Sequence, residues 1–151
     1  METKISSEYE KDCNSIQTDC KRAGNPTPVG TLLEDIMRAA VIAYPEELLE
    51  NNAQIIATYR HKFCNVYIKS IQKSRSGCGV FDQLLLESSY YNKSSVHYSH
   101  AGSVRPDIYW PQKGYVFDFK FMGGSVRNTE VERWKEHLPF FSNYRAIRED
   151  K

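Results

Sequence analysis

Two aspartates stand on what the sequence predicts to be the two strands of a β-hairpin. Pro111–Gly114 is a turn cluster between two runs rich in β-branched and aromatic residues, a pattern typical of such a hairpin. If the loop leaves Trp110 opposite Tyr115, then Asp107 lies opposite Asp118. Directly opposed residues have Cβ atoms about 4.5–5.5 Å apart, so the two carboxylates would lie side by side.

Two neighbouring carboxylates need compensation, because at roughly 5 Å and an effective dielectric near 20 they repel each other by about 3 kcal/mol. A divalent cation held by Asp107, Asp118 and the backbone carbonyl of Phe119 would supply it. Oxygen ligands favour Mg²⁺, with Mn²⁺ or Zn²⁺ as alternatives. Such a metal polarises phosphoryl oxygens and activates water, and Lys120, on the same face, would orient that water. The alternative interpretation is an ordinary exposed sheet face with scattered charges.

The segments Arg105–Asp107 and Asp118–Lys120 together resemble the PD-(D/E)xK motif of restriction-endonuclease-like nucleases. The resemblance implies an α/β fold in an α+β arrangement, with a restriction-endonuclease-like core. In that core a central mixed sheet carries the catalytic β-hairpin and is flanked by helices. It also implies that an acidic residue of the first helix joins the metal site and the catalytic set. Glu34 is the candidate by position, with Asp35 and Glu46 as rivals, although Glu34 also fits a helix-capping role.

The hairpin residues divide into two faces, because strand side chains alternate with period 2. One face is apolar throughout and is predicted to face the core: Val104, Pro106, Ile108, Trp110, Tyr115, Phe117, Phe119 and Phe121. The other face carries Arg105, Tyr109, Val116 and the three motif side chains. A slip of one residue would exchange the two faces, so the apolar set fixes the register.

The elements before the hairpin are predicted to be helical. Residues 1–29 have few apolar positions and are interpreted as a tail or linker, followed by a nuclease domain over residues 30–151. A capping box of Thr31 and Glu34 predicts a helix start, and Tyr44-Pro45 ends that helix. Apolar residues then recur at helical spacing to about Lys73, in one helix or two, although 63–71 could also form a strand.

The elements around and after the hairpin are less uniform. Residues 80–91 are predicted to be either a helix or the first strand of the sheet, and 96–100 could form another strand. A capping box of Thr129 and Glu132 predicts a helix with Val131, Trp134 and Leu138 on one face, ending at Pro139. Asn143–Arg148 is predicted to be a last strand.

The basic residues are distributed unevenly, although the net charge is only +1. The segment Arg60–Arg75 contains no acidic residue and could follow a phosphate backbone, or could simply be a solvated helix face. The predicted nucleic-acid contacts are Lys69, Lys73, Arg75, Arg105 and Arg133, the last from the helix after the motif, which in the resembled family often touches phosphate.

Cysteine and histidine residues give weaker signals. Cys13, Cys20, Cys64 and Cys78 follow no zinc or disulfide spacing and are interpreted as reduced thiols. The pair His97 and His100 could bind a metal, but no third ligand follows it, so a loop or strand role is the alternative.

The sequence therefore predicts a Mg²⁺-dependent endonuclease acting on DNA, with RNA, including tRNA, as the alternative substrate. A non-catalytic nucleic-acid-binding or protein-interaction module is the competing hypothesis. The small size also resembles the C-terminal nuclease modules of contact-dependent or polymorphic bacterial toxins, which would imply a dedicated immunity protein as partner. The chain has no apolar run of transmembrane length and no signal-peptide pattern. The expected place of action is a cytoplasm, reached by delivery into a target cell if the protein is part of a larger toxin.

Overall fold

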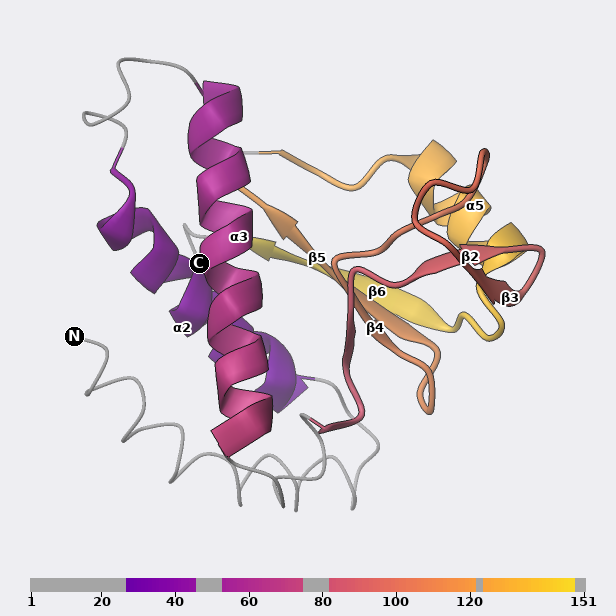
Figure 1. The fold of residues 1–151 in the computed structure, drawn as a ribbon, viewed down its shortest axis with the longest axis horizontal. Coiled ribbons are helices and arrows are strands. Elements are labelled where there is room, and N and C mark those ends of the chain that lie inside the picture. The colour runs from indigo at the N-terminus through magenta and orange to yellow at the C-terminus, as the bar shows by residue number, and fades with distance from the viewer. Residues whose placement is uncertain (1–26, 46–52, 75–81, 122–123, 149–151) are drawn as a thin grey trace. The chain divides into compact units, whose positions relative to one another are not determined.

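The computed structural model describes residues 27–45, 53–74, 82–121 and 124–148 (Figure 1). These residues divide between two compact units. The helical unit comprises the described residues up to Asp82 together with Phe121, Ile147 and Arg148, and the sheet unit comprises 83–120 and 124–146. Of the predicted tail, residues 1–26 lie outside the described part of the chain.

The helical unit is built on two packed helices, α2 (Thr27–Ala43) and α3 (Ala53–Ser74). Each presents an apolar stripe that is buried, comprising Val29, Leu32, Leu33, Ile36, Met37, Ala39 and Ala40 in α2, and Ile56, Cys64, Ile68 and Ile71 in α3. The strand alternative for residues 63–71 is therefore wrong. The predicted capping box is also wrong, because α2 begins at Thr27 and Thr31 and Glu34 already lie within the helix.

Arg60 is a structural residue of the helical unit, although it belongs to the basic segment predicted to follow phosphate. Its side chain is 1% exposed. Its Nε donates a hydrogen bond to the carbonyl oxygen of Tyr44 at 3.0 Å, and its guanidinium lies 5.8 Å from the ring centre of Phe121. A guanidinium that is buried in this way packs within the unit and is not available to a phosphate backbone.

The sheet unit contains a four-stranded sheet, a separate two-stranded sheet and one helix. The large sheet has the order β1 (Leu85–Leu86), β4 (Ile108–Trp110), β5 (Tyr115–Lys120), β6 (Asn143–Arg148), and the small one pairs β2 (Ser89–Tyr91) with β3 (Ser94–Val96). The pairs β1–β4 and β4–β5 are antiparallel. Strands β5 and β6, connected through α5 (Asn128–His137), point the same way in Figure 1, so the large sheet is mixed. The last two residues of β6, Ile147 and Arg148, belong to the helical unit.

The predicted register of the hairpin is confirmed, because Trp110 pairs with Tyr115 and Ile108 pairs with Phe117. The turn between the strands is closed by a hydrogen bond from the N–H of Lys113 to the carbonyl of Trp110 at 3.2 Å. Gly114 takes a positive φ of 62° there. An added Cβ at this glycine would lie 2.8 Å from the ring of Phe140, so the turn accepts no larger residue without strain.

The face of the hairpin that was expected to be polar is buried along most of its length. Tyr109 is 1% exposed and Val116 is 0% exposed, and both belong to a core cluster with Tyr90, Val104, Trp134 and Leu138. The prediction that Val104 shares the face of Ile108 is therefore wrong. The apolar side of α5 covers this face, so the hairpin is buried on both sides, and on this face only its end near Asp118 carries charge.

Other predicted elements are partly right. The strand Asn143–Arg148 is confirmed, and the region 80–91 contributes strands β1 and β2. The strand suggested for 96–100 does not extend beyond Val96. Helix α5 starts two residues earlier than its predicted capping box, because its N-cap is Arg127 and not Thr129. The N–H of Arg127 donates to Oε1 of Glu130 at 3.1 Å.

Candidate active site

Asp107 and Asp118 lie side by side, as the register requires. Asp107 directly precedes β4, and Asp118 lies within β5 opposite to it. Oδ2 of Asp107 accepts a hydrogen bond from the backbone N–H of Phe119 at 2.8 Å, which holds the carboxyl group against β5. The two carboxyl groups lie close enough for the charge of Asp118 to raise the pKa of Asp107.

The surroundings of Asp107 change the pKa of its carboxyl group. Burial, followed by the charge of Asp118 and the hydrogen bond with it, raises the pKa of Asp107 well above its usual range, and the Phe119 N–H offsets only part of this. Burial beside Asp118 therefore favours the neutral form of the Asp107 carboxyl group. A cation bound to both carboxyl groups would instead favour their ionised forms.

Lys120 lies against Asp118. Its Nζ is 2.9 Å from Oδ2 of Asp118 and 3.5 Å from Oε1 of Glu130. Burial by itself would lower the pKa of Lys120, but the hydrogen bond and charge of Asp118, with Glu130, outweigh it and raise that pKa. The side chain is therefore a fixed ammonium group at the site.

Glu130 was not singled out from the sequence, although it joins the site. It is in the first turn of α5, where the same carboxylate caps the helix at Arg127 and contacts Lys120. Its place three residues after Arg127 is an ordinary N3 position, so the sequence could have indicated a cap but not the contact with Lys120.

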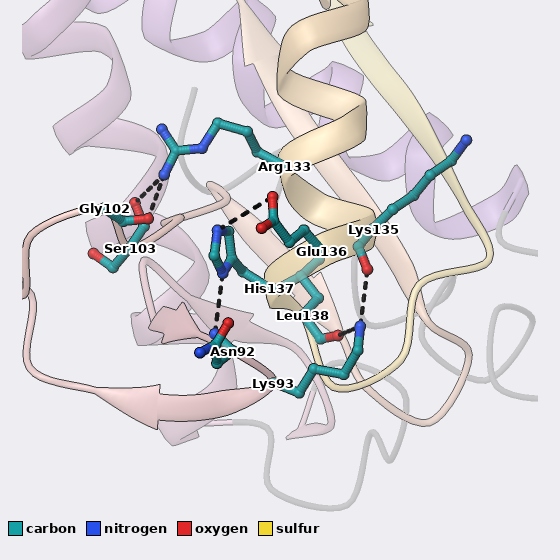
Figure 2. Close-up of polar contacts among 9 residues, drawn as sticks. All are labelled: Asn92, Lys93, Gly102, Ser103, Arg133, Lys135, Glu136, His137 and Leu138. Atoms are coloured by element: carbon teal, nitrogen blue, oxygen red, sulfur yellow. Dashed lines mark hydrogen bonds and ion pairs between the residues drawn. The ribbon is translucent and has the colours of Figure 1, made fainter.

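A cleft of about 200 Å³ opens at this end of the sheet unit. Its walls are Ser103, Val104, Arg105, Pro106, Asp118, Glu130, Arg133 and Trp134. Arg105 pairs with Oε1 of Glu87 at 3.1 Å, and Arg133 donates to the carbonyl oxygens of Gly102 and Ser103, as Figure 2 shows. Two arginines predicted separately as phosphate contacts are thus brought to the same cleft as Asp118 and Glu130.

The other predicted site residues belong to the helical unit. Glu34 is buried within α2, and its role as a further ligand stays a prediction. Its rival Asp35 is paired with Arg38, and Glu46 lies outside the described residues. Lys69 and Lys73 are exposed on α3, whereas Arg75 lies outside the described residues.

The donor set of the site limits which metal it could hold. Within the described residues, no group of three or more His, Cys, Asp and Glu side chains gathers as a metal site would, so Asp107 and Asp118 contribute two carboxylates. Two carboxylates fit Mg²⁺ or Mn²⁺, because Mg²⁺ keeps several waters and commonly binds one or two protein carboxylates together with substrate phosphates. They do not match the nitrogen and sulfur ligands typical of Zn²⁺.

The histidine pair does not supply such ligands. His97 and His100 lie on an exposed turn, where Nδ1 of His97 is 2.8 Å from Oγ of Ser99 and Nδ1 of His100 is 3.0 Å from the carbonyl oxygen of Ala101. Of the cysteines, Cys64 is buried and unbridged, and Cys13, Cys20 and Cys78 lie outside the described residues.

Comparisons of the chain with protein-family models, with curated proteins and with solved structures find no match. Among the helices of the described residues, none is long and apolar enough to cross a membrane. The function is therefore inferred from the geometry of the site itself.

Proposed function

We propose that the protein is a metal-dependent nuclease that hydrolyses phosphodiester bonds, with DNA as the first candidate substrate and RNA as the second. The observation that carries the proposal is the Asp107–Asp118 pair with Lys120 2.9 Å from Asp118, at a cleft lined by Arg105 and Arg133. Paired acids with a neighbouring ammonium, next to a cleft that contains two arginines, suit phosphodiester hydrolysis.

The order of elements supports the same class. Helices α2 and α3 precede β1, the β4–β5 hairpin, α5 and β6. The resembled restriction-endonuclease-like core implies the order α-β-β-β-α-β, which these elements follow with one further helix before β1. The separate β2–β3 hairpin is inserted between β1 and β4. The order of elements does not by itself define an activity, so the nuclease function is inferred from the site, and the order agrees with it.

Each side chain has a definable role in this proposal. Asp107 and Asp118 would hold Mg²⁺, which when bound activates a water and stabilises charge on the phosphate. Lys120 holds its ammonium beside Asp118, where it can orient the attacking water and stabilise the developing negative charge. Arg105 and Arg133 can bind phosphate oxygens at the cleft walls, since a guanidinium presents two parallel donors.

The test is incubation of the protein with plasmid DNA and with total tRNA, each with Mg²⁺ and with EDTA. We expect cleavage only with Mg²⁺. Asp107→Asn and Asp118→Asn should each lower the rate by more than about a hundredfold, because loss of a metal ligand removes several kcal/mol of transition-state stabilisation. Glu132→Gln is the matched control, since this carboxylate lies exposed on α5. Cleavage by either aspartate variant at the parent rate would rule out the site.

A second candidate function is a nucleic-acid-binding module without catalysis. It is favoured by one observation: each carboxyl group of the pair already has a donor from the chain, the Phe119 N–H for Asp107 and the Lys120 ammonium for Asp118. Calorimetric titration with Mg²⁺ and Mn²⁺ separates the two functions. The nuclease requires a metal site that disappears in both Asp107→Asn and Asp118→Asn, whereas the binding module requires none.

A further inference from the structure

The turn between β3 and Val104 presents an aromatic ring to solvent beside the cleft. Tyr98 is 68% exposed, and its ring centre lies 4.4 Å from that of His97. The guanidinium of Arg105, which lines the cleft, lies 6.0 Å from the same ring. Arg105 is held in place by hydrogen bonds from Nε to the carbonyl oxygen of Glu87 and from Nη2 to its carboxylate, each 3.1 Å long.

The base of this turn is held firmly, so the exposure of Tyr98 does not reflect an unsupported loop. Backbone hydrogen bonds join His100 to His97 at 2.9 Å and Ser103 to His100 at 3.2 Å. Arg133 of α5 donates to the carbonyl oxygens of Gly102 and Ser103 (Figure 2). The guanidinium thus joins the turn to the helix at the wall of the cleft.

A stack of rings supports the turn from the other side. His100 packs on Tyr91 with ring centres 4.7 Å apart, and Tyr91 stacks on His137 at 4.8 Å and 18°. Nδ1 of His137 accepts the backbone N–H of Asn92 at 3.0 Å, which fixes this ring between α5 and the β2–β3 turn (Figure 2). Lys93 adds hydrogen bonds to the carbonyl oxygens of Lys135 and Leu138 at 2.8 and 3.3 Å.

We infer that Tyr98, flanked by His97 and Arg105, is a stacking site for an unpaired nucleotide base, so that the substrate is single-stranded nucleic acid or has unpaired nucleotides. The inference rests on the proposed nuclease function for its biological meaning. Every base has a π face, and stacking on an aromatic side chain strengthens binding about 5- to 150-fold per base. In a duplex these faces are covered by neighbouring bases, so an exposed ring selects unpaired ones.

The position of Arg105 connects the stacking site to the chemistry. The same side chain faces the Tyr98 ring and lines the cleft that Asp118 and Glu130 also line. A base on Tyr98 and a phosphate in the cleft would therefore belong to neighbouring positions of one strand. Such a strand would be bound by stacking of a base on Tyr98 and by ion pairing of a neighbouring phosphate with Arg105.

The direct test uses the Tyr98→Trp variant in EDTA, so that nothing is cleaved. Trp110 and Trp134 are 1% and 4% exposed and give a nearly constant background of fluorescence. We expect a short single-stranded oligonucleotide to quench the new indole, whereas the same sequence as a duplex should not. DNA and RNA versions of the strand show which sugar is preferred. No quenching by either single strand, or equal quenching by the duplex, would overturn the inference.

Affinity measurements with side-chain controls complete the test. Tyr98→Ala should weaken single-strand binding in EDTA about tenfold and leave duplex binding unchanged. Tyr98→Phe, which keeps the ring, should bind like the parent. If the parent cleaves in Mg²⁺ but Tyr98→Ala binds and cleaves single strands as the parent does, the stacking site is wrong and the nuclease stands. If the parent never cleaves but the Tyr98→Ala loss is seen, the stacking site stands and the nuclease proposal fails.

Discussion

The carboxyl group of Asp107 links the charge state of the site to the stability of the protein. Burial, and then the neighbouring Asp118, raise the pKa of Asp107 in the folded state above its unfolded value. A carboxyl group of this kind contributes its stability fully below the unfolded pKa and loses it as the pH rises through the folded pKa. At neutral pH, without metal, Asp107 therefore opposes folding.

We predict that Asp107→Asn stabilises the metal-free protein at neutral pH. The amide can still accept the Phe119 N–H and can donate to Asp118, but it never ionises. The difference in melting temperature between variant and parent in EDTA should therefore be small at acidic pH and grow as the pH rises. Asp35→Asn, which removes a carboxylate paired with Arg38 in the helical unit, is the control. A difference in melting temperature between Asp107→Asn and the parent that stays the same at every pH would contradict the raised pKa of Asp107.

Lys120 allows catalysis to be separated from binding. We predict that Lys120→Met, which keeps most of the side-chain stem, lowers kcat about a hundredfold, because it removes the ammonium 2.9 Å from Asp118. Affinity for nucleic acid in EDTA should change much less. Lys135→Met removes an exposed ammonium on α5 and should alter neither quantity. A loss of affinity with kcat unchanged for Lys120→Met would make this lysine a binding residue only.

At the scale of elements, the hairpin could be predicted because its information is local. The turn cluster and the period-2 alternation fix the pairing of Trp110 with Tyr115, and the position of Asp107 opposite Asp118 follows from it. The burial of Tyr109 and Val116 could not be predicted in the same way. It depends on the docking of α5, which is encoded after the hairpin and has no local signal on β4 or β5.

The helix starts show a different limit of the sequence. Thr31 with Glu34, and Thr129 with Glu132, both match the capping-box pattern, yet α2 begins at Thr27 and α5 at Asn128. A cap contributes about 0.5–2 kcal/mol, and burial of an adjoining apolar turn can outweigh it. In α2 the buried Val29 lies in the first helical turn, which the capping box at Thr31 placed outside the helix.

The burial of Tyr109 changes the expected effect of removing its hydroxyl group. That hydroxyl donates to the carbonyl oxygen of Phe140 at 2.6 Å and accepts the N–H of the same residue at 3.1 Å. From sequence, Tyr109→Phe is a mild change on an open face. Because two backbone groups of Phe140 lose their partner in a partly buried environment, we now predict a loss of about 1 kcal/mol in the free energy of unfolding.

Urea unfolding of the Tyr109→Phe variant measures this loss. Tyr115→Phe is the matched control, because its hydroxyl makes one hydrogen bond, to the carbonyl oxygen of Tyr144 at 3.2 Å, and the residue is only partly buried. The control should lose less than the Tyr109 variant. The opposite order would show that α5 and the loop after it do not close over this face of the hairpin.

At the scale of the whole molecule, the sequence supplies the parts of the site but does not reveal their assembly. Arg105 and Arg133 were predicted for separate reasons, and the structure brings both to one cleft with Asp118. Arg60 shows the reverse, since a residue of the basic segment is buried in the helical unit. Both outcomes depend on the packing of residues far apart in the chain, which composition and periodicity do not report.

The net charge of +1 means that any nucleic-acid footprint must come from local clusters of basic residues. One candidate is the pair of arginines at the cleft, and the other is the predicted set Lys69, Lys73 and Arg75. Lys69 and Lys73 are exposed on α3 and can reach a phosphate, whereas Arg60 is buried and cannot. The two footprints differ in how many counterions they would release, and this can be measured.

We predict that Lys69→Gln/Lys73→Gln/Arg75→Gln weakens binding of nucleic acid and flattens its dependence on salt. Each cation that binds a phosphate adds about 0.7–0.9 to the slope of log K against log salt concentration, so the slope should fall by that amount for every phosphate-binding cation that the variant removes. Binding isotherms in EDTA at several salt concentrations give the slope without cleavage. The charge-keeping variant Lys69→Arg/Lys73→Arg/Arg75→Lys should retain the parent slope. If the neutral variant also retains it, α3 does not touch the phosphate backbone, and the footprint reduces to Arg105 and Arg133 beside the paired aspartates.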